Sequence, residues 1–262
     1  MAEFIRYTIE DKVAVLVIDH PPVNAMNEQT LKELGEALDA LNADPSVKVI
    51  VITGGGQLAF VAGADIGTFG EIFKGQDFDR AKAFMELGHS TLSKIENSNK
   101  PVIAAINGVC LGGGLELAMA CHMRICGDRV RLGQPEINLG IIPGWGGTQR
   151  LQRIVGPAKA TEMILTGDQI TAQQAMQLRL VNMVVPGGEV MRQAKGLAAK
   201  IANKSAVATA SALTAIRVGL DASLQDGLAA EREQLAKVVT SDDAREGIMA
   251  FLEKREAKFS DK

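Results

Sequence analysis

Glu116 is the residue whose type and position first point to chemistry. It lies in the run Gly112–Cys121 (GGGLELAMAC), where three glycines precede a short apolar helix and Glu116 is the only charged residue. Glycines let another molecule approach the backbone, and the first N–H groups of a helix have no acceptor within it, so this segment offers donors to an external oxygen. A carboxylate on such a helix is either paired or catalytic, because an unpaired buried charge is costly. A simpler interpretation also stays open at this point, namely a first-turn carboxylate that the helix dipole favours.

The segments around this run predict an α/β chain followed by helices. Lys100–Gly108 is a short apolar run entered through Pro101, which predicts a buried strand directly before the glycines. Further strands are expected at 4–9, 13–19, 47–53 and 180–185. Helices are expected at 27–42, 65–74, 77–97, 115–121, 157–165, 171–178, 189–202, 206–219, 223–239 and 242–259, with one more that ends near 155. We therefore expect an α/β core over residues 1–188 and a helical C-terminal region over 189–262, a place where helices often cover a subunit interface.

Composition and charge exclude several classes of protein. The 262 residues are 47% apolar, 23% charged and only 4% aromatic, which is typical of a globular protein with an aliphatic core. The net charge of −3 argues against a general nucleic-acid or membrane surface. The first residues contain neither a long apolar run nor an arginine-rich leader, and no stretch approaches about 18 uninterrupted apolar residues. We expect no signal peptide, no transit peptide and no membrane span.

The chain also argues against a resident cofactor or metal. Gly54–Gly56 follows an expected strand and suggests a phosphate-binding loop, but neither Gly-Lys-Ser/Thr nor Gly-x-Gly-x-x-Gly is present there. The three cysteines, Cys110, Cys121 and Cys126, are an odd number without paired spacing, which is typical of reduced thiols in a cytoplasmic protein. Together with His122 they fit no zinc spacing, so we expect no metal site.

Five segments together resemble the crotonase (enoyl-CoA hydratase/isomerase) superfamily, and most closely its short-chain enoyl-CoA hydratases. They are HPPVNAMN at 20–27, FVAGADI at 60–66, KPVIAAINGVCLGGGLELAMAC at 100–121, GQPEINLGIIPGWGGTQRL at 133–151 and FLEKREAKF at 251–259. Their order and spacing extend the resemblance over essentially the whole chain. It implies an α/β fold with a spiral of stacked ββα units and a helical C-terminal trimerisation region. The assembly would be a homotrimer, or a homohexamer made of two trimers.

The resemblance also implies a reaction and four catalytic groups. The backbone N–H groups of Ala64 and Gly113 would form an oxyanion hole for the carbonyl of an acyl-CoA thioester. By the same resemblance, Glu116 would activate the water that attacks C3 and Glu136 would deliver a proton to C2. Glu136 lies between Pro135 and Ile137, a setting that could desolvate it and raise its pKa. Coenzyme A is then part of the substrate, and no further cofactor is expected.

The remaining contacts to the substrate are implied in the same way. Lys254 would reach a CoA phosphate, often across a subunit boundary, although a solvated charge beside Glu253 and Arg255 is the alternative. Gly144 would help to hold the catalytic water. Trp145 would narrow or cap the acyl pocket, with core packing as the alternative. The other expected CoA-binding residues are Val23, Ala25, Ala62, Gly63, Asp65, Ile66, Gly67 and Gly112.

Two positions depart from the pattern of the family. Gly67 stands where many relatives carry a lysine, which weakens any expectation of a charged CoA contact there. His122 replaces a common aspartate, with no consequence that the sequence explains. Both glutamates are present, which favours hydration over double-bond isomerisation. The remaining alternatives are a specialised dienoyl or branched substrate and, less favoured, a CoA-binding protein without catalysis.

Overall fold

The main sheet contains the strand that was expected before Glu116. The computed structural model describes residues 2–262. The sheet has the order β1-β2-β3-β5-β7-β10, and all its neighbours are parallel except β1 and β2. Its strands are β1 (Ile5–Glu10), β2 (Val13–Ile18), β3 (Val49–Gly54), β5 (Val102–Ile106), β7 (Met123–Gly127) and β10 (Met183–Val185). All residues of β3 and β5 are buried, as their unbroken apolar sequence predicts for parallel strands covered on both faces.

A second sheet carries the segments that surround the glycines, and the sequence did not predict it. Its order is β4-β6-β8-β9, with β9 antiparallel to β8. The strands are β4 (Ala59–Val61), β6 (Val109–Leu111), β8 (Arg131–Gly133) and β9 (Ile170–Thr171). The strands expected from the sequence do not include β4, which lies in the segment after Gly54–Gly56 that was interpreted as a loop. Strands of two or three residues have no periodicity of their own, and only pairing between distant segments forms them.

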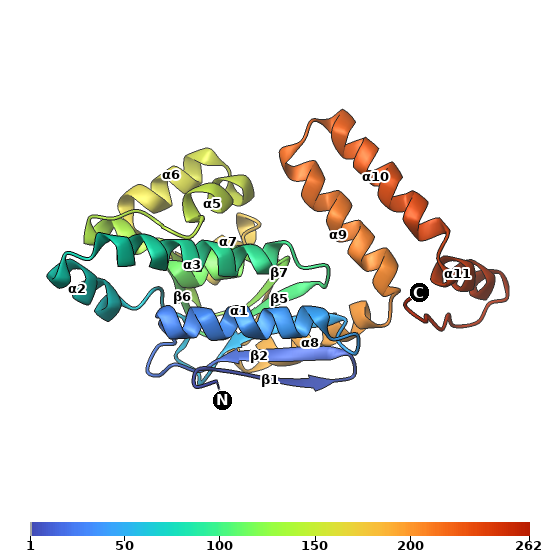
Figure 1. Ribbon diagram of the computed structural model, residues 1–262, viewed down its shortest axis with the longest axis horizontal. Helices are drawn as coiled ribbons and strands as arrows, with labels where there is room; N and C mark the ends of the chain where they lie inside the picture. The colour runs from blue at the N-terminus through green and yellow to red at the C-terminus, as the bar shows by residue number, and fades with distance from the viewer. Residues whose placement is uncertain (1) are drawn as a thin grey trace.

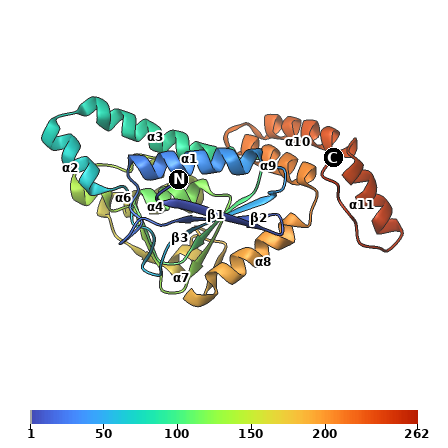
Figure 2. The ribbon, with the colours of Figure 1, turned by 60° about the horizontal axis from the view of Figure 1, so that its bottom comes forward.

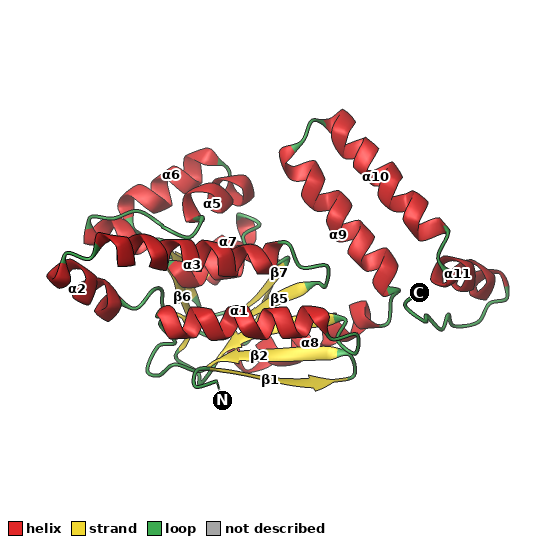
Figure 3. Cartoon of the chain, viewed as in Figure 1, coloured by secondary structure: helices red, strands yellow, loops and turns green. Residues whose placement is uncertain are grey.

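Helices cover both faces of the main sheet (Figures 2 and 3). α1 (Glu28–Ala43), α3 (Phe78–Glu96) and α4 (Gly113–Ala120) share one hydrophobic core with the sheet. On the opposite face, α8 (Val190–Ala202) packs Ala194 and Ala198 against Val51 and Ile103. The boundary at residue 188 would assign α8 to the C-terminal helices, but this packing makes α8 part of the core.

The C-terminal helices extend away from the core (Figure 1). α9 (Ala206–Asp221) and α10 (Leu224–Val239) form an antiparallel pair, and α11 (Asp242–Leu252) follows at the far end. The expectation that the last helix continues to residue 259 is wrong, because the chain leaves the helix after Leu252 and Lys254 adopts a positive φ of 54°. The remaining helices are α2 (Ile66–Gly75), the 3₁₀ helix η1 (Pro135–Leu139), α5 (Gly147–Val155), α6 (Pro157–Thr166), α7 (Ala172–Gln177) and the 3₁₀ helix η2 (Gly187–Glu189). Within the described residues, no helix is both long and apolar enough to cross a bilayer.

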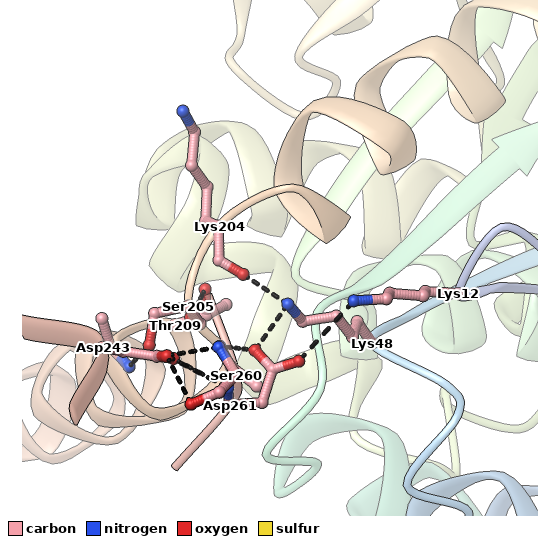
Figure 4. Close-up of polar contacts among 10 residues, drawn as sticks. Lys12, Lys48, Lys204, Ser205, Thr209, Asp243, Ser260 and Asp261 are labelled. Carbon is pink, nitrogen blue, oxygen red and sulfur yellow. Dashed lines mark hydrogen bonds and ion pairs between the residues drawn. The ribbon is translucent and has the colours of Figure 1, made fainter. Parts of the chain in front are cut away.

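A polar cluster fixes the end of the chain between the core and these helices (Figure 4). The Lys48 ammonium, whose side chain is 6% exposed, lies 2.6 Å from Asp261 Oδ1 and donates to the Lys204 carbonyl, also at 2.6 Å. Asp261 accepts from the Ala206 N–H at the start of α9, and its own N–H donates to the buried Asp243 at the start of α11. The chain end therefore connects three elements that are distant in sequence.

We expect Lys48→Met to lower the free energy of unfolding by about 1–3 kcal/mol, because the Lys204 carbonyl loses its donor and Asp261 loses its nearer cation. Urea unfolding followed by circular dichroism measures this change. Lys12→Met is the matched control, since Lys12 is 53% exposed and lies 3.8 Å from the same carboxylate. Its effect should stay within about 0.5 kcal/mol. Equal losses in the two variants would contradict a specific role for Lys48.

The structure explains His122, the departure that the sequence left without a consequence. Its Nδ1 accepts a hydrogen bond of 3.0 Å from the Val102 N–H at the start of β5. Burial, followed by the charges of Arg124 and Arg217, lowers the pKa of His122 from 6.5 to about 4. The imidazole is therefore neutral, as an acceptor at Nδ1 requires.

Because the folded state holds His122 neutral, acid should destabilise the protein through this residue. Between about pH 6.5 and 4 the unfolded chain binds a proton at His122 that the folded chain does not, so stability falls as the pH is lowered through this window. His122→Asn keeps an acceptor for the Val102 N–H but does not titrate. We expect the wild-type melting temperature to fall more steeply than that of the variant between pH 6.5 and 4. Parallel curves would contradict the assignment.

Candidate active site

Glu116 is buried and held by the backbone. It lies in the first turn of α4, where strong helix formers follow the two initial glycines. Every residue of α4 is buried, and Glu116 itself is only 2% exposed. Its Oε1 accepts hydrogen bonds from the Trp145 N–H at 2.8 Å and from the Gly147 N–H, the start of α5, at 2.6 Å. Burial raises the pKa of Glu116, and these two bonds oppose that rise by stabilising the carboxylate. A hydrogen-bonded carboxylate with a raised pKa can accept and return a proton.

Glu136 faces the same space from the other side. It lies in η1, and its Oε1 would be 3.0 Å from a Cβ placed on Gly112. Burial raises the pKa of Glu136 to about 7, and the nearby charge of Glu116 adds to the rise. Among residues 2–262, its buried Oε2 has no hydrogen-bond partner. The two carboxyls therefore differ in environment, one with two donors on a single oxygen and the other with a free oxygen.

Two backbone N–H groups lie beside these carboxyls. Gly113 is the first residue of α4, where an N–H has no acceptor within the helix. The bridge between Met26 and Ala64 uses the Gly63 carbonyl and the Asp65 N–H, so the N–H of Ala64 itself points to the opposite side. A Cβ on Gly113 would lie 3.4 Å from the Ala64 nitrogen. The two donors are therefore neighbours, as a site for one shared oxygen requires.

One cavity of about 940 Å³ unites the four groups. Ala64, Gly113, Glu116 and Glu136 all line it. Its other walls are largely apolar and come from α2, α3, η1 and the loop that precedes α5. An apolar cavity with a few convergent polar groups and perturbed carboxyls is typical of an enzyme active site.

The structure brings together some of the expected CoA contacts and separates others. Six of them line the cavity with the catalytic candidates: Ala62, Gly63, Ile66, Gly112, Gly144 and Trp145. The Asp65 carboxylate instead accepts from the Gly67 N–H and caps α2, and neither residue lines the cavity. Val23 and Ala25 do not line the cavity. The Val23 carbonyl accepts from the N–H of Ala62, which follows β4, and Ala25 precedes the bridge residue Met26. Lys254 follows α11 at the opposite end of the molecule (Figure 1).

Sequence reasoning missed two groups of residues in and around this site. Gln134 is fully buried, donates to the Gly112 carbonyl at 3.3 Å and, within the described chain, has a buried Oε1 without a partner. Its place directly before Pro135-Glu136 was the only signal that could have identified it. The apolar side chains that line the cavity from α2, α3, η1 and the loop after η1 are Phe69, Phe73, Met85, Leu139, Ile141 and Ile142. In the sequence they resemble ordinary core residues, and only the fold turns them toward a cavity.

Known proteins match the chain over nearly its full length. Residues 8–262 match the family model described as enoyl-CoA hydratase/isomerase. A crotonyl-CoA hydratase from Syntrophomonas wolfei is 42% identical over 254 residues, which are 97% of this chain and 96% of that protein. A short-chain-enoyl-CoA hydratase from Clostridium acetobutylicum is 41% identical over 94% of this chain and 93% of that protein. The crystal structure of an enoyl-CoA hydratase from Bacillus anthracis matches with a TM-score of 0.95 and 35% identity, covering 99% of this chain and all of that chain.

The fold and the cavity define an enzyme of the crotonase class. The chain belongs to the enoyl-CoA hydratase/isomerase family. This confirms the resemblance drawn from the five segments, and the α/β fold with a helical C-terminal region is confirmed as well.

Proposed function

We propose that the protein is an enoyl-CoA hydratase that adds water reversibly and syn to 2-trans-enoyl-CoA, giving 3-hydroxyacyl-CoA. One observation carries the proposal: two carboxyls of unequal environment and two neighbouring residues with backbone N–H groups line one cavity. Related proteins named as hydratases support the same reading. Isomerases of the family often keep only one of the two carboxyls, so the intact pair favours hydration.

In the proposed reaction the thioester carbonyl accepts from the Ala64 and Gly113 N–H groups. Attack of water at C3 moves charge onto this oxygen, and preorganised donors stabilise that charge. The loss of one such donor typically costs about 3–4 kcal/mol of barrier. Glu116 takes the proton of the attacking water, and Glu136 donates a proton to C2. A pKa of about 7 leaves Glu136 partly protonated near neutral pH, as a proton donor requires.

The remaining expected contacts would bind the CoA part of the substrate and the attacking water. We propose that Ala62, Gly63 and Ile66 contact the thioester end of CoA, with Val23 and Ala25 along the pantetheine. Gly144 would help to place the water. Lys254 follows α11, which lies at the opposite end of the molecule from the cavity-lining helix α2 (Figure 1), so in this proposal it reaches the CoA phosphate of a neighbouring subunit. The reaction uses only these side chains and amides and calls for no metal or redox cofactor.

We also propose that the chain works as a homotrimer or a dimer of trimers in the cytoplasm. Large apolar side chains are exposed on the C-terminal helices, among them Ile216, Leu220, Leu235, Ile248 and Phe251. Many large apolar side chains exposed on one group of helices favour an interaction surface there. Light scattering on the purified protein measures the mass, and a monomer would contradict the proposal.

The activity is tested with a panel of 2-trans-enoyl-CoA esters of rising chain length. Loss of the conjugated thioester absorbance reports hydration, and product analysis separates 3-hydroxyacyl-CoA from a shifted double bond. We expect turnover of at least the shorter esters. Absence of turnover on every ester would reject the proposal, and a product with only a shifted double bond would favour an isomerase.

A further inference from the structure

The indole of Trp145 lies between α3 and α4. Each helix has a glycine where it meets the ring, and no other residue would fit there. A Cβ on Gly88, in the middle of α3, would lie 2.1 Å from Trp145 Nε1 and 2.3 Å from Cε2. A Cβ on Gly113, at the start of α4, would lie 2.4 Å from Cζ3 at the other end of the ring. Real side chains do not approach so closely, so both edges of the indole depend on a missing side chain. Glycine inside a helix costs roughly 1 kcal/mol of stability relative to alanine. The contact with the indole explains why a glycine nevertheless stands at position 88.

Neighbouring groups fix the indole further. Phe84 meets it edge-on, with ring centroids 5.4 Å apart and planes at 86°, and Phe69 packs against Phe84 at 5.5 Å. Trp145 is 3% exposed, and its backbone N–H donates to Glu116. The ring therefore cannot move without disturbing α3 or α4.

The indole lies where the acyl chain would continue beyond the reacting carbons. With the carbonyl at Ala64 and Gly113, C2 lies near Glu136 and C3 near Glu116. Carbons after C3 then approach Trp145, which is buried, lines the same cavity and packs its indole against Gly113. By contrast, Ile66, Phe73, Leu139 and Ile142 line the same cavity but are more than half exposed. Trp145 therefore closes the inner end of the cavity, while these side chains surround its opening.

We propose that Trp145 sets the acyl-chain limit of this enzyme and that Gly88 is the positioning residue that admits its indole. The substrate class is then short-chain 2-enoyl thioesters. This inference rests on the proposed hydratase activity and adds to it the length of the acyl group. Gly88 touches no reacting atom and acts only through the ring.

The first test is Trp145→Ala, assayed with crotonyl-CoA and trans-2-octenoyl-CoA. Removing the indole opens the inner end, so we expect the ratio of kcat/KM for octenoyl to that for crotonyl to rise at least tenfold, on the order of what one or two added methylenes are worth in a fitted pocket. An unchanged ratio would overturn the proposal.

The second test separates the role of Gly88 from a helix effect. Gly88→Ala places a methyl group into the indole, so we expect kcat/KM for crotonyl-CoA to fall about tenfold or more. In Gly88→Ala/Trp145→Ala the indole is absent, so the methyl group clashes with no ring. The kcat/KM of the double variant for crotonyl-CoA should match that of Trp145→Ala within about twofold. An equal fall in both backgrounds would overturn the positioning role.

Gly196→Ala is the matched control, because Gly196 is also inside a helix, α8, and within the described chain a Cβ there would meet no atom within 4 Å. Its kinetics should equal those of the wild type, and a loss like that of Gly88→Ala would count against the contact with the indole. The wild type separates the two proposals. If it turns over no ester, the hydratase function itself fails, whereas an active wild type with an unmoved length ratio overturns only this inference.

Discussion

Glu136→Gln is expected to lower kcat by about 10²- to 10⁴-fold while the affinity for the CoA ester changes little. The amide has nearly the shape of the carboxyl but cannot deliver a proton to C2. Binding depends mainly on the backbone groups and the apolar walls, which the substitution leaves in place. Because burial raises the pKa of Glu136 to about 7, the amide also removes a charge that is costly to bury above that pH. The melting temperature of the variant at about pH 8 should therefore not fall.

Stopped assays give kcat, and titration with a non-reactive acyl-CoA gives the dissociation constant. Glu86→Gln is the control, since Glu86 is an exposed glutamate of α3 that interacts only weakly with Lys82 at 3.9 Å. The control should retain wild-type kcat. If Glu136→Gln lost affinity and kept its kcat, Glu136 would be a binding residue and not the proton donor.

Glu116→Gln should produce a loss of similar size for a different reason. The amide oxygen can still accept from the Trp145 and Gly147 N–H groups, so the start of α5 stays in place. The NH₂ group that replaces the second oxygen cannot take a proton from water. We therefore expect kcat to fall about 10²- to 10⁴-fold without loss of the fold.

The double variant Glu116→Gln/Glu136→Gln tests whether the two carboxyls act as one unit. If they share a single water, the second substitution adds little to the first, as for other catalytic groups that function together. We expect the double variant to lie within about tenfold of the slower single variant. Losses that multiply fully would assign the two glutamates to independent steps.

Much of the fold was predictable because its larger elements have a clear local sequence pattern. The pattern is an unbroken apolar run in β3 and β5 and helical spacing in α1 and α3, and all four elements lie within a few residues of their expected bounds. The second sheet was not predictable, since β4, β6, β8 and β9 have two or three residues each and form only by pairing across the chain. The end of α11 was misplaced because residues 253–259 include good helix formers. The structure instead gives Arg255 and Glu246 a paired contact that turns the chain back.

The candidate site divides in the same way. The glycines and Glu116 are visible in one segment, and Glu136 gained its importance from the resemblance and not from any local signal. The pKa of Glu136 depends on burial that no spacing reveals. The contact of Trp145 with Gly88 joins the loop before α5 to the middle of α3, so the sequence alone left two interpretations of the ring, core packing and a wall of the pocket. In the structure the ring is packed in the core and lines the cavity.

The two amides on a single oxygen of Glu116 have a consequence for the handedness of the product. Oε1 already accepts two hydrogen bonds, which fills both of its lone pairs, so under the proposed roles only Oε2 can orient a water molecule. A water held from one direction meets one face of the planar double bond. The 3-hydroxy ester would then form as one enantiomer, and in the reverse direction its mirror image would not be dehydrated.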